Sequence, residues 1–138
     1  MWRLGCRALA PVLIAACSST VPAVSPRTIN GHWGGPGVQL SDSVAVHGIV
    51  LSFRCTVVLF PGPIAVDSSG SFAAEGVVVW STWSPAMGRA ARIAGSVDGH
   101  TMQLEFTEAR LPGQWSAYAH YTLSQRQAAD WSGIACAA

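Results

Sequence analysis

The chain has 138 residues; half are hydrophobic, only 11% are charged, and the formal net charge is +1. This length suits one domain better than two. All eight basic residues are arginines and they form no basic stripe, so the sequence argues against nucleic-acid binding.

The first 16 residues have the pattern of an export signal. Arg3 and Arg7 lie in a short N-terminal region, and the apolar stretch Ala8–Ala16 follows them. A membrane-spanning helix needs about 20 apolar residues, whereas this shorter stretch fits the core of a signal peptide. Removing residues 1–16 removes two of the eight arginines and leaves six against seven acidic residues, a formal charge of −1.

The end of this segment resembles the lipobox of bacterial lipoproteins. Ile14-Ala15-Ala16-Cys17 gives an aliphatic residue, two small residues and the cysteine. The resemblance implies that Cys17 becomes the acylated N-terminus and anchors the chain to a membrane of the bacterial cell envelope. Ser18 implies the outer membrane if the organism has one. An ordinary secretory signal cut near Ala16 or Ala23 is the alternative.

A short linker and then one domain are expected after the signal. Residues 17–30 are rich in Ser, Pro and Thr without periodicity, which predicts a flexible tether between lipid and domain. We expect the folded domain to cover residues 31–138.

The four cysteines divide by position. Cys6 leaves with the signal peptide and Cys17 carries the lipid, so Cys55 and Cys136 remain. In an oxidising compartment their simplest fate is one disulfide. It would close a loop of about 80 residues, for which chain entropy gives roughly 4–5 kcal/mol. Two free buried thiols are the alternative; a zinc site is less favoured because neither has a Cys or His at ligand spacing.

The body of the domain reads as a series of short strands. β-Branched and aromatic runs alternate with turn residues about every 10 positions, and no helical period persists. The heptapeptide 125–131 could form one helical turn or a loop. The expected strands cover residues 38–40, 46–55, 56–60 with 64–66, 71–80, 91–97, 101–107, 114–123 and, as an eighth candidate, 133–136.

Alternation within these runs predicts which side chains share a face. The turns between the strands are expected at Asp67–Gly70, at the corner Pro61-Gly62-Pro63, and at Asp98-Gly99 as a two-residue hairpin loop. The predicted faces are Ile49, Leu51, Phe53 and Cys55; Phe72, Ala74, Gly76, Val78 and Trp80; Met102, Leu104 and Phe106; and Trp115, Ala117, Ala119, Tyr121 and Leu123.

Eight short strands joined by hairpins predict an all-β fold. The expected architecture is a small antiparallel up-and-down barrel, because closure removes exposed sheet edges. Such a barrel is either filled by side chains or holds one small ligand. A two-sheet sandwich is the alternative.

Several motifs resemble those of secreted lipocalin-like barrels. Gly31-His32-Trp33 lies where lipocalins and avidins carry Gly-x-Trp near the first strand. The wider pattern resembles a group of uncharacterised bacterial lipocalin-like lipoproteins, which implies the barrel fold and no established activity. That pattern is Trp33-Gly34-Gly35, Phe53-x-Cys55, Asp67-x-x-Gly70-x-Phe72 and Gly95-x-Val97-x-Gly99-x-x-Met102-x-Leu104.

No catalytic or metal-binding motif appears in the chain. There is no GxSxG elbow, HExxH pair, phosphate loop or dinucleotide fingerprint. The histidines are expected to be surface or hydrogen-bonded groups, and no acid pair is recommended for glycoside chemistry. The sequence therefore predicts no enzyme, no metal site and no cofactor. The histidines are His32, His47, His100 and His120.

Tryptophans are the candidates for recognition. Trp80 and Trp83 flank the loop Ser81–Arg89 at one expected barrel mouth, and Trp115 belongs to the same candidate ligand site. The competing interpretation makes Trp33, Trp80 and Trp115 core residues and leaves Trp83 exposed.

Three functions fit this sequence. The first is an anchored barrel that binds a small apolar ligand or lipid. The second is a protein-interaction module or inhibitor of an extracellular hydrolase, acting through the loops Pro61–Pro63, Ser81–Arg89 and Arg110–Gln114. The third is an envelope component without a ligand.

Overall fold

The computed structural model describes residues 26–81, 88–111 and 113–134, and every regular element in these ranges is a β-strand. These ranges contain no helix that could span a membrane. The side chains at 80–81, 110–111 and 116–118 are not described. The strands are β1 (Arg27–Ile29), β2 (His32–Gly35), β3 (Val38–Ser43), β4 (Gly48–Phe53), β5 (Thr56–Pro61), β6 (Ile64–Val66), β7 (Ser71–Ser81), β8 (Ala90–Asp98), β9 (Thr101–Leu111) and β10 (Gln114–Gln125).

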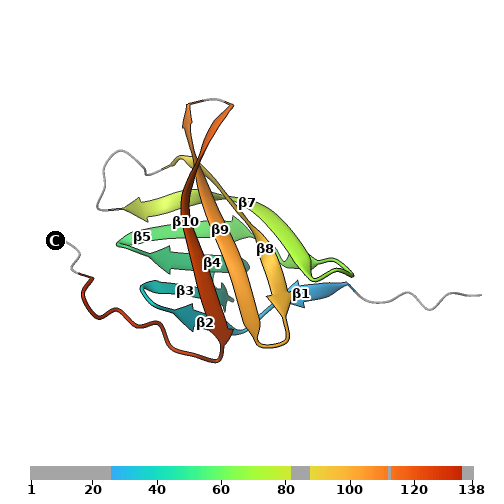
Figure 1. Ribbon diagram of the computed structural model, residues 1–138. Helices are drawn as coiled ribbons and strands as arrows, with labels where there is room; N and C mark the ends of the chain where they lie inside the picture. The colour runs from blue at the N-terminus through green and yellow to red at the C-terminus, as the bar shows by residue number, and fades with distance from the viewer. Residues whose placement is uncertain (1–25, 82–87, 112, 135–138) are drawn as a thin grey trace, which may run out of the picture.

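Eight of these strands form a closed antiparallel barrel (Figure 1). Their order is β10-β2-β3-β4-β5-β7-β8-β9, so each strand lies beside its neighbour in the chain once β6 is left aside. β1 and β6 pair with each other in a separate two-stranded ribbon. The prediction of an all-β, up-and-down barrel is confirmed.

The eighth barrel strand is not the segment that the sequence offered as an eighth candidate. The sequence suggested residues 133–136, whereas β2 occupies that place and pairs Trp33 with Gln125 and Gly34 with Ser124. Gly133 and Ile134 lie outside any strand, and 135–136 are beyond the described residues. β2 was missed because Trp33 is followed by two glycines, which depress strand propensity. In the structure these glycines permit close contact, since a Cβ on Gly35 would lie 2.4 Å from the Thr122 carbonyl oxygen.

The ribbon of β1 and β6 covers one end of the barrel, which we call the closed end. Ile29, Ile64 and Val66 of the ribbon are buried. The prediction that residues 17–30 are all tether is therefore wrong for Arg27–Ile29, which pair with β6. Pro61-Gly62-Pro63 forms the predicted corner, where the chain leaves β5 and enters the ribbon.

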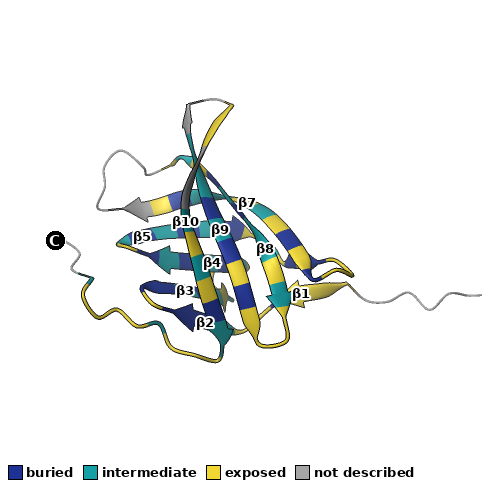
Figure 2. Cartoon of the chain, viewed as in Figure 1, coloured by how far each residue is buried: buried dark blue, intermediate teal, exposed yellow. Residues whose placement is uncertain are grey.

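Buried and exposed residues alternate along the barrel strands (Figure 2). The buried side chains fill the interior. Met102, Leu104 and Phe106 are buried as predicted, while the intervening Gln103 is exposed. The Phe53 ring packs on Phe106 with centroids 4.6 Å apart. Aromatic and aliphatic side chains thus occupy the barrel centre.

Two turns differ from their predicted form. β4 ends at Phe53, and Arg54 and Cys55 form the two-residue loop with φ of 39° and 62°. Positive φ at both positions belongs to type I′ hairpins, so Cys55 leaves the buried face on which it was expected. Asp98 pairs with Thr101, which makes Gly99 and His100 the loop residues in place of Asp98-Gly99.

Candidate functional site

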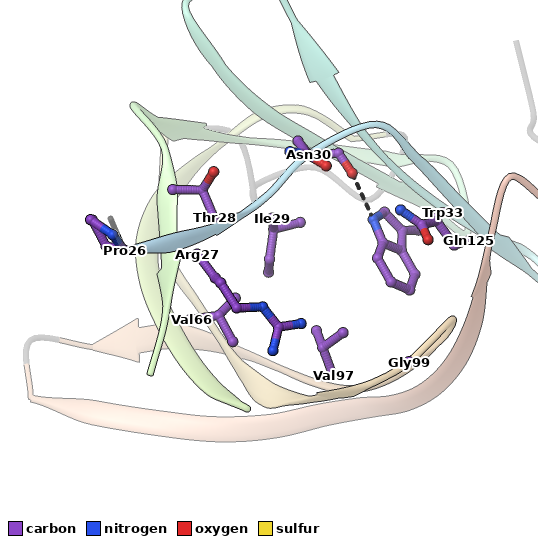
Figure 3. Close-up of a pocket in the computed structure, with 10 residues that line it drawn as sticks. All are labelled: Pro26, Arg27, Thr28, Ile29, Asn30, Trp33, Val66, Val97, Gly99 and Gln125. Atoms are coloured by element: carbon purple, nitrogen blue, oxygen red, sulfur yellow. Dashed lines mark hydrogen bonds between the residues drawn. The ribbon is translucent and has the colours of Figure 1, made fainter. Parts of the chain in front are cut away.

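A pocket of about 460 Å³ lies at the closed end, between the ribbon and the barrel (Figure 3). We call it the closed-end pocket. β1 supplies Arg27 and Ile29, and the Arg27 side chain points into the space beside Val66 and Val97. The described residues that line it are Pro26, Arg27, Thr28, Ile29, Asn30, Trp33, Val66, Val97, Gly99 and Gln125.

Hydrogen bonds fix two walls of this pocket. Trp33 is buried, and its indole Nε1–H donates to the Asn30 carbonyl oxygen at 3.0 Å. The Gln125 Oε1 lies 2.8 Å from His100 Nδ1. Arg27 is exposed, and among the described residues no carboxylate lies within ion-pair distance of it.

The neighbouring turn between β6 and β7 is held by Asp67. Its Oδ1 accepts hydrogen bonds from the backbone N–H groups of Ser69 (2.8 Å) and Ser71 (2.9 Å) and from the Ser69 hydroxyl at 2.6 Å. The Ser69 hydroxyl and these backbone donors lower the pKa of the Asp67 carboxyl. The predicted turn is confirmed, and this carboxylate has a structural role within it.

At the opposite end of the barrel, β9 and β10 continue as a projecting hairpin (Figure 1). We call this the hairpin end. Trp115 near the start of β10 is 37% exposed. The Arg92 guanidinium lies 4.3 Å from its ring centroid, and Arg92 forms an ion pair with Glu75. The outer surface of the hairpin therefore presents an aromatic ring held by a cation.

The structure places Trp115 on the face opposite to the predicted one. Ala117 pairs with Thr107 and Ala119 with Phe106, so one extra residue enters β10 between them. Such a bulge reverses the alternation. The prediction that Trp115 shares a face with Tyr121 and Leu123 is wrong, because sequence periodicity does not register an inserted residue.

Trp115 belongs to an apolar row that crosses the outside of the sheet. Val50 pairs with Leu59, Leu59 with Val77, and Val77 with Ala90. Ala91 pairs with Glu108, which places Ala90 level with Ala109, and Ala109 pairs with Trp115. The outer row consists of Val50, Leu59, Val77, Ala90, Ala109 and Trp115.

An ion pair lies near the rim at the hairpin end. Arg89 Nη1 is 3.3 Å from Glu108 Oε1, and the Glu108 side chain is only 12% exposed. Glu108 is opposite the buried Ala91, which puts this carboxylate in the inward phase of β9. The Arg89 guanidinium therefore neutralises the Glu108 carboxylate at the point where the apolar core ends. No sequence motif marked it.

The other predicted site residues are only partly within the described structure. The Trp80 side chain, Trp83, Cys17 and Cys136 all lie outside it. Trp33 is a core residue, as one of the two sequence interpretations held. An exposed Trp131 in the C-terminal segment was not singled out from the sequence.

Two of the three loops suggested for partner binding lie at opposite ends of the barrel. Pro61–Pro63 lies at the closed end, where Gly62 N–H donates to the His47 carbonyl oxygen. Arg110–Gln114 forms the tip of the projecting hairpin, with residue 112 outside the described part. Most of Ser81–Arg89 is also outside it. One binding surface at the hairpin end would therefore include the hairpin tip but not the proline corner.

The titratable residues form no metal cluster in the described ranges. His47 and His100 lie in turns. His120 points away from the core beside Glu105, with 3.6 Å between Nδ1 and Oε2.

No protein-family model matches the chain, and neither curated proteins nor solved structures give a match.

Proposed function

We propose that this chain is an exported, lipid-anchored protein-interaction module of the bacterial envelope, built on a lipocalin-like barrel. The hairpin end makes the contact. The observation that carries the proposal is Trp115, exposed on a projecting hairpin and held in place by Arg92. Trp and Arg dominate the binding energy of protein interfaces.

Surrounding features favour a protein partner over a ligand inside the barrel. The centre is occupied by large buried side chains such as Phe53, Phe60 and Phe106. Four pockets lined by described residues lie at the ends of the barrel. The outer row gives Trp115 apolar neighbours, and the ion pair of Glu75 with Arg92 borders it. An apolar centre with a polar border is the usual anatomy of an interface.

The backbone of the hairpin offers a second means of contact. Only Ser124 and Gln125 of β10 pair with β2, so within the described part no strand pairs with Gln114–His120 on the side away from β9. β10 contains no Lys, Arg, Asp, Glu or Pro, the residues that usually protect such an edge. A partner segment in extended conformation could add to this edge.

The lipid anchor at Cys17 and the disulfide between Cys55 and Cys136 complete the proposal. One pocket is lined by both Arg54 and Ile134, so the segment leading to Cys136 passes beside the turn that holds Cys55. Cys136 is two residues beyond Ile134, a reach of at most about 7 Å of extended chain, which supports a bridge to Cys55. Mass spectrometry should find acyl groups on the Cys17 peptide and a bridged peptide without reductant. An unmodified Cys17 or two free thiols would refute these parts.

Site-specific photo-crosslinking in the native cell tests the interaction. A photoreactive residue replaces Gln114, which is exposed next to Trp115, in one variant and Val44 in the other. Val44 is 86% exposed in the closed-end turn and serves as the matched control. We expect a discrete crosslinked protein from position 114 and none from position 44. The same products from both positions, or none from position 114, would refute the proposal.

Measuring the affinity for the partner then tests the role of the Arg92 guanidinium. With the crosslinked partner purified, Arg92→Gln should weaken binding by about fivefold or more, because the ring loses the group that orients it. Arg126→Gln, which removes the same charge from the exposed turn after β10 at the closed end, should leave the affinity unchanged. Equal losses in the two variants would mean that net charge alone governs binding.

A further inference from the structure

We propose that the closed-end pocket binds a monocarboxylate with a compact apolar body. This site is separate from the hairpin surface and does not depend on the proposed partner. The proposal starts from the placement of Arg27, whose guanidinium points into a pocket of about 460 Å³.

The charge of the pocket selects an anion. Arg27 is the only charged residue among the described residues that line the pocket. No described carboxylate neutralises it. The planar fork of a guanidinium matches the two oxygens of a carboxylate and can bind both. A single such group suits a monoanion better than a species with several negative charges.

Gln125 supplies a second donor to the same space. Its Oε1 is engaged by His100 Nδ1 at 2.8 Å, which leaves the amide NH₂ group of Gln125 available. The Trp33 Nε1–H is already used by the Asn30 carbonyl oxygen. Trp33 therefore contributes ring surface to the pocket.

The walls define the rest of the ligand. Ile29, Val66 and Val97 line the pocket together with the Trp33 ring. Ile29 and Trp33 are each only 4% exposed, so these walls are held by the core. Preformed apolar walls with a few placed polar groups are typical of small-molecule sites. An aliphatic or aromatic group next to the carboxylate would bury surface against them.

NMR of the ¹⁵N-labelled full mature chain tests this inference with hexanoate as the probe. The Trp33 indole N–H and the Arg27 Nε–H report on the pocket directly. We expect both signals to shift and to saturate with hexanoate. Neither hexanamide, which lacks the charge, nor acetate, which lacks the apolar body, should shift them appreciably. Equal shifts with hexanamide, or no shift with hexanoate, would overturn the proposal.

Two variants connect the shifts to Arg27. Arg27→Gln should weaken hexanoate binding by about tenfold or more, as expected for losing a charge-assisted bidentate contact. Arg54→Gln removes the same charge from the hairpin end and should leave the affinity unchanged. The dispersed spectrum of Arg27→Gln would show that the fold persists. Unchanged hexanoate affinity in folded Arg27→Gln would exclude Arg27 as the anion contact.

Discussion

The two ends of the barrel differ in what happens to their apolar side chains: one end buries them and the other exposes them. At the closed end, β1 and β6 fold back and bury Ile29, Ile64 and Val66 against the core. At the hairpin end, β9 and β10 run on past the core and expose Trp115. Apolar side chains stabilise the fold where a second layer covers them, and they remain available for recognition where none does.

The largest effect should come from removing a side chain that fastens the ribbon. Ile64→Ala leaves a cavity between β6 and the barrel, because Ile64 is 3% exposed. We expect a loss of about 2–5 kcal/mol in the free energy of unfolding, measured by urea denaturation. A loss below about 1 kcal/mol would mean that the ribbon contributes little to the fold and that the contrast between the ends is wrong.

The segment after β10 runs from one end of the barrel to the other. It packs so closely on Gly34 that there is no room for a side chain there. A Cβ there would lie 2.3 Å from the Gln127 carbonyl oxygen, because this segment crosses the outside of β2. Gly34→Ala should destabilise the chain by about 1–3 kcal/mol, comparable to overpacking a core. The urea midpoint would measure it.

Gly113→Ala at the hairpin tip provides the comparison for that result. Its φ is +79° but it has open space around it. Backbone strain alone should cost about 1–2 kcal/mol there. Resistance of the Gln125–Ile134 region to proteolysis should fall in Gly34→Ala only.

At the hairpin end, truncation should change binding far more than stability. Trp115→Ala removes an exposed ring, so we expect the free energy of unfolding to change by less than about 1 kcal/mol. Binding to the crosslinked partner should weaken by tenfold or more, as for an interface hot spot. A large loss of stability with unchanged binding would reverse the roles assigned to the two ends.

The smallest effect concerns the Asp67 turn at the closed end. Because hydrogen bonds lower its folded pKa below the ordinary 3.8, the ionised carboxylate stabilises the fold above that value. This contribution falls as the pH drops below 3.8 and through the folded pKa. Asp67→Ala should therefore lower the Tm at pH 7, and its difference from wild type should shrink toward pH 2. Ser68→Ala, in the same turn, should show no such pH dependence.

Much of the barrel was accessible from the sequence because alternation in an antiparallel sheet is a local property. Met102, Leu104 and Phe106 were assigned to the core from their spacing, and their burial confirms it. β2 escaped detection because its two glycines read as a break, and β1 because three residues give too little pattern. Both segments are strands because they pair with distant strands, β1 with β6 and β2 with β10.

The candidate sites were less accessible, because each depends on contacts between distant parts of the chain. The sequence singled out Trp115 but put it on the wrong face, since an inserted residue in β10 is invisible to periodicity. Arg27 belonged to a segment expected to be a tether. It gains its environment from Val66, Val97 and Gln125, which come from three other strands.

The sequence alone therefore determined the all-β class, the approximate number of strands and most of the inward side chains, because the period of two follows from backbone geometry. It also raised the expectation of an export signal in residues 1–16 and of a lipid on Cys17. Tertiary structure decided which strand closes the barrel, what covers its closed end and which tryptophan faces outward. Those outcomes depend on pairing partners, bulges and close backbone contacts that no local pattern encodes.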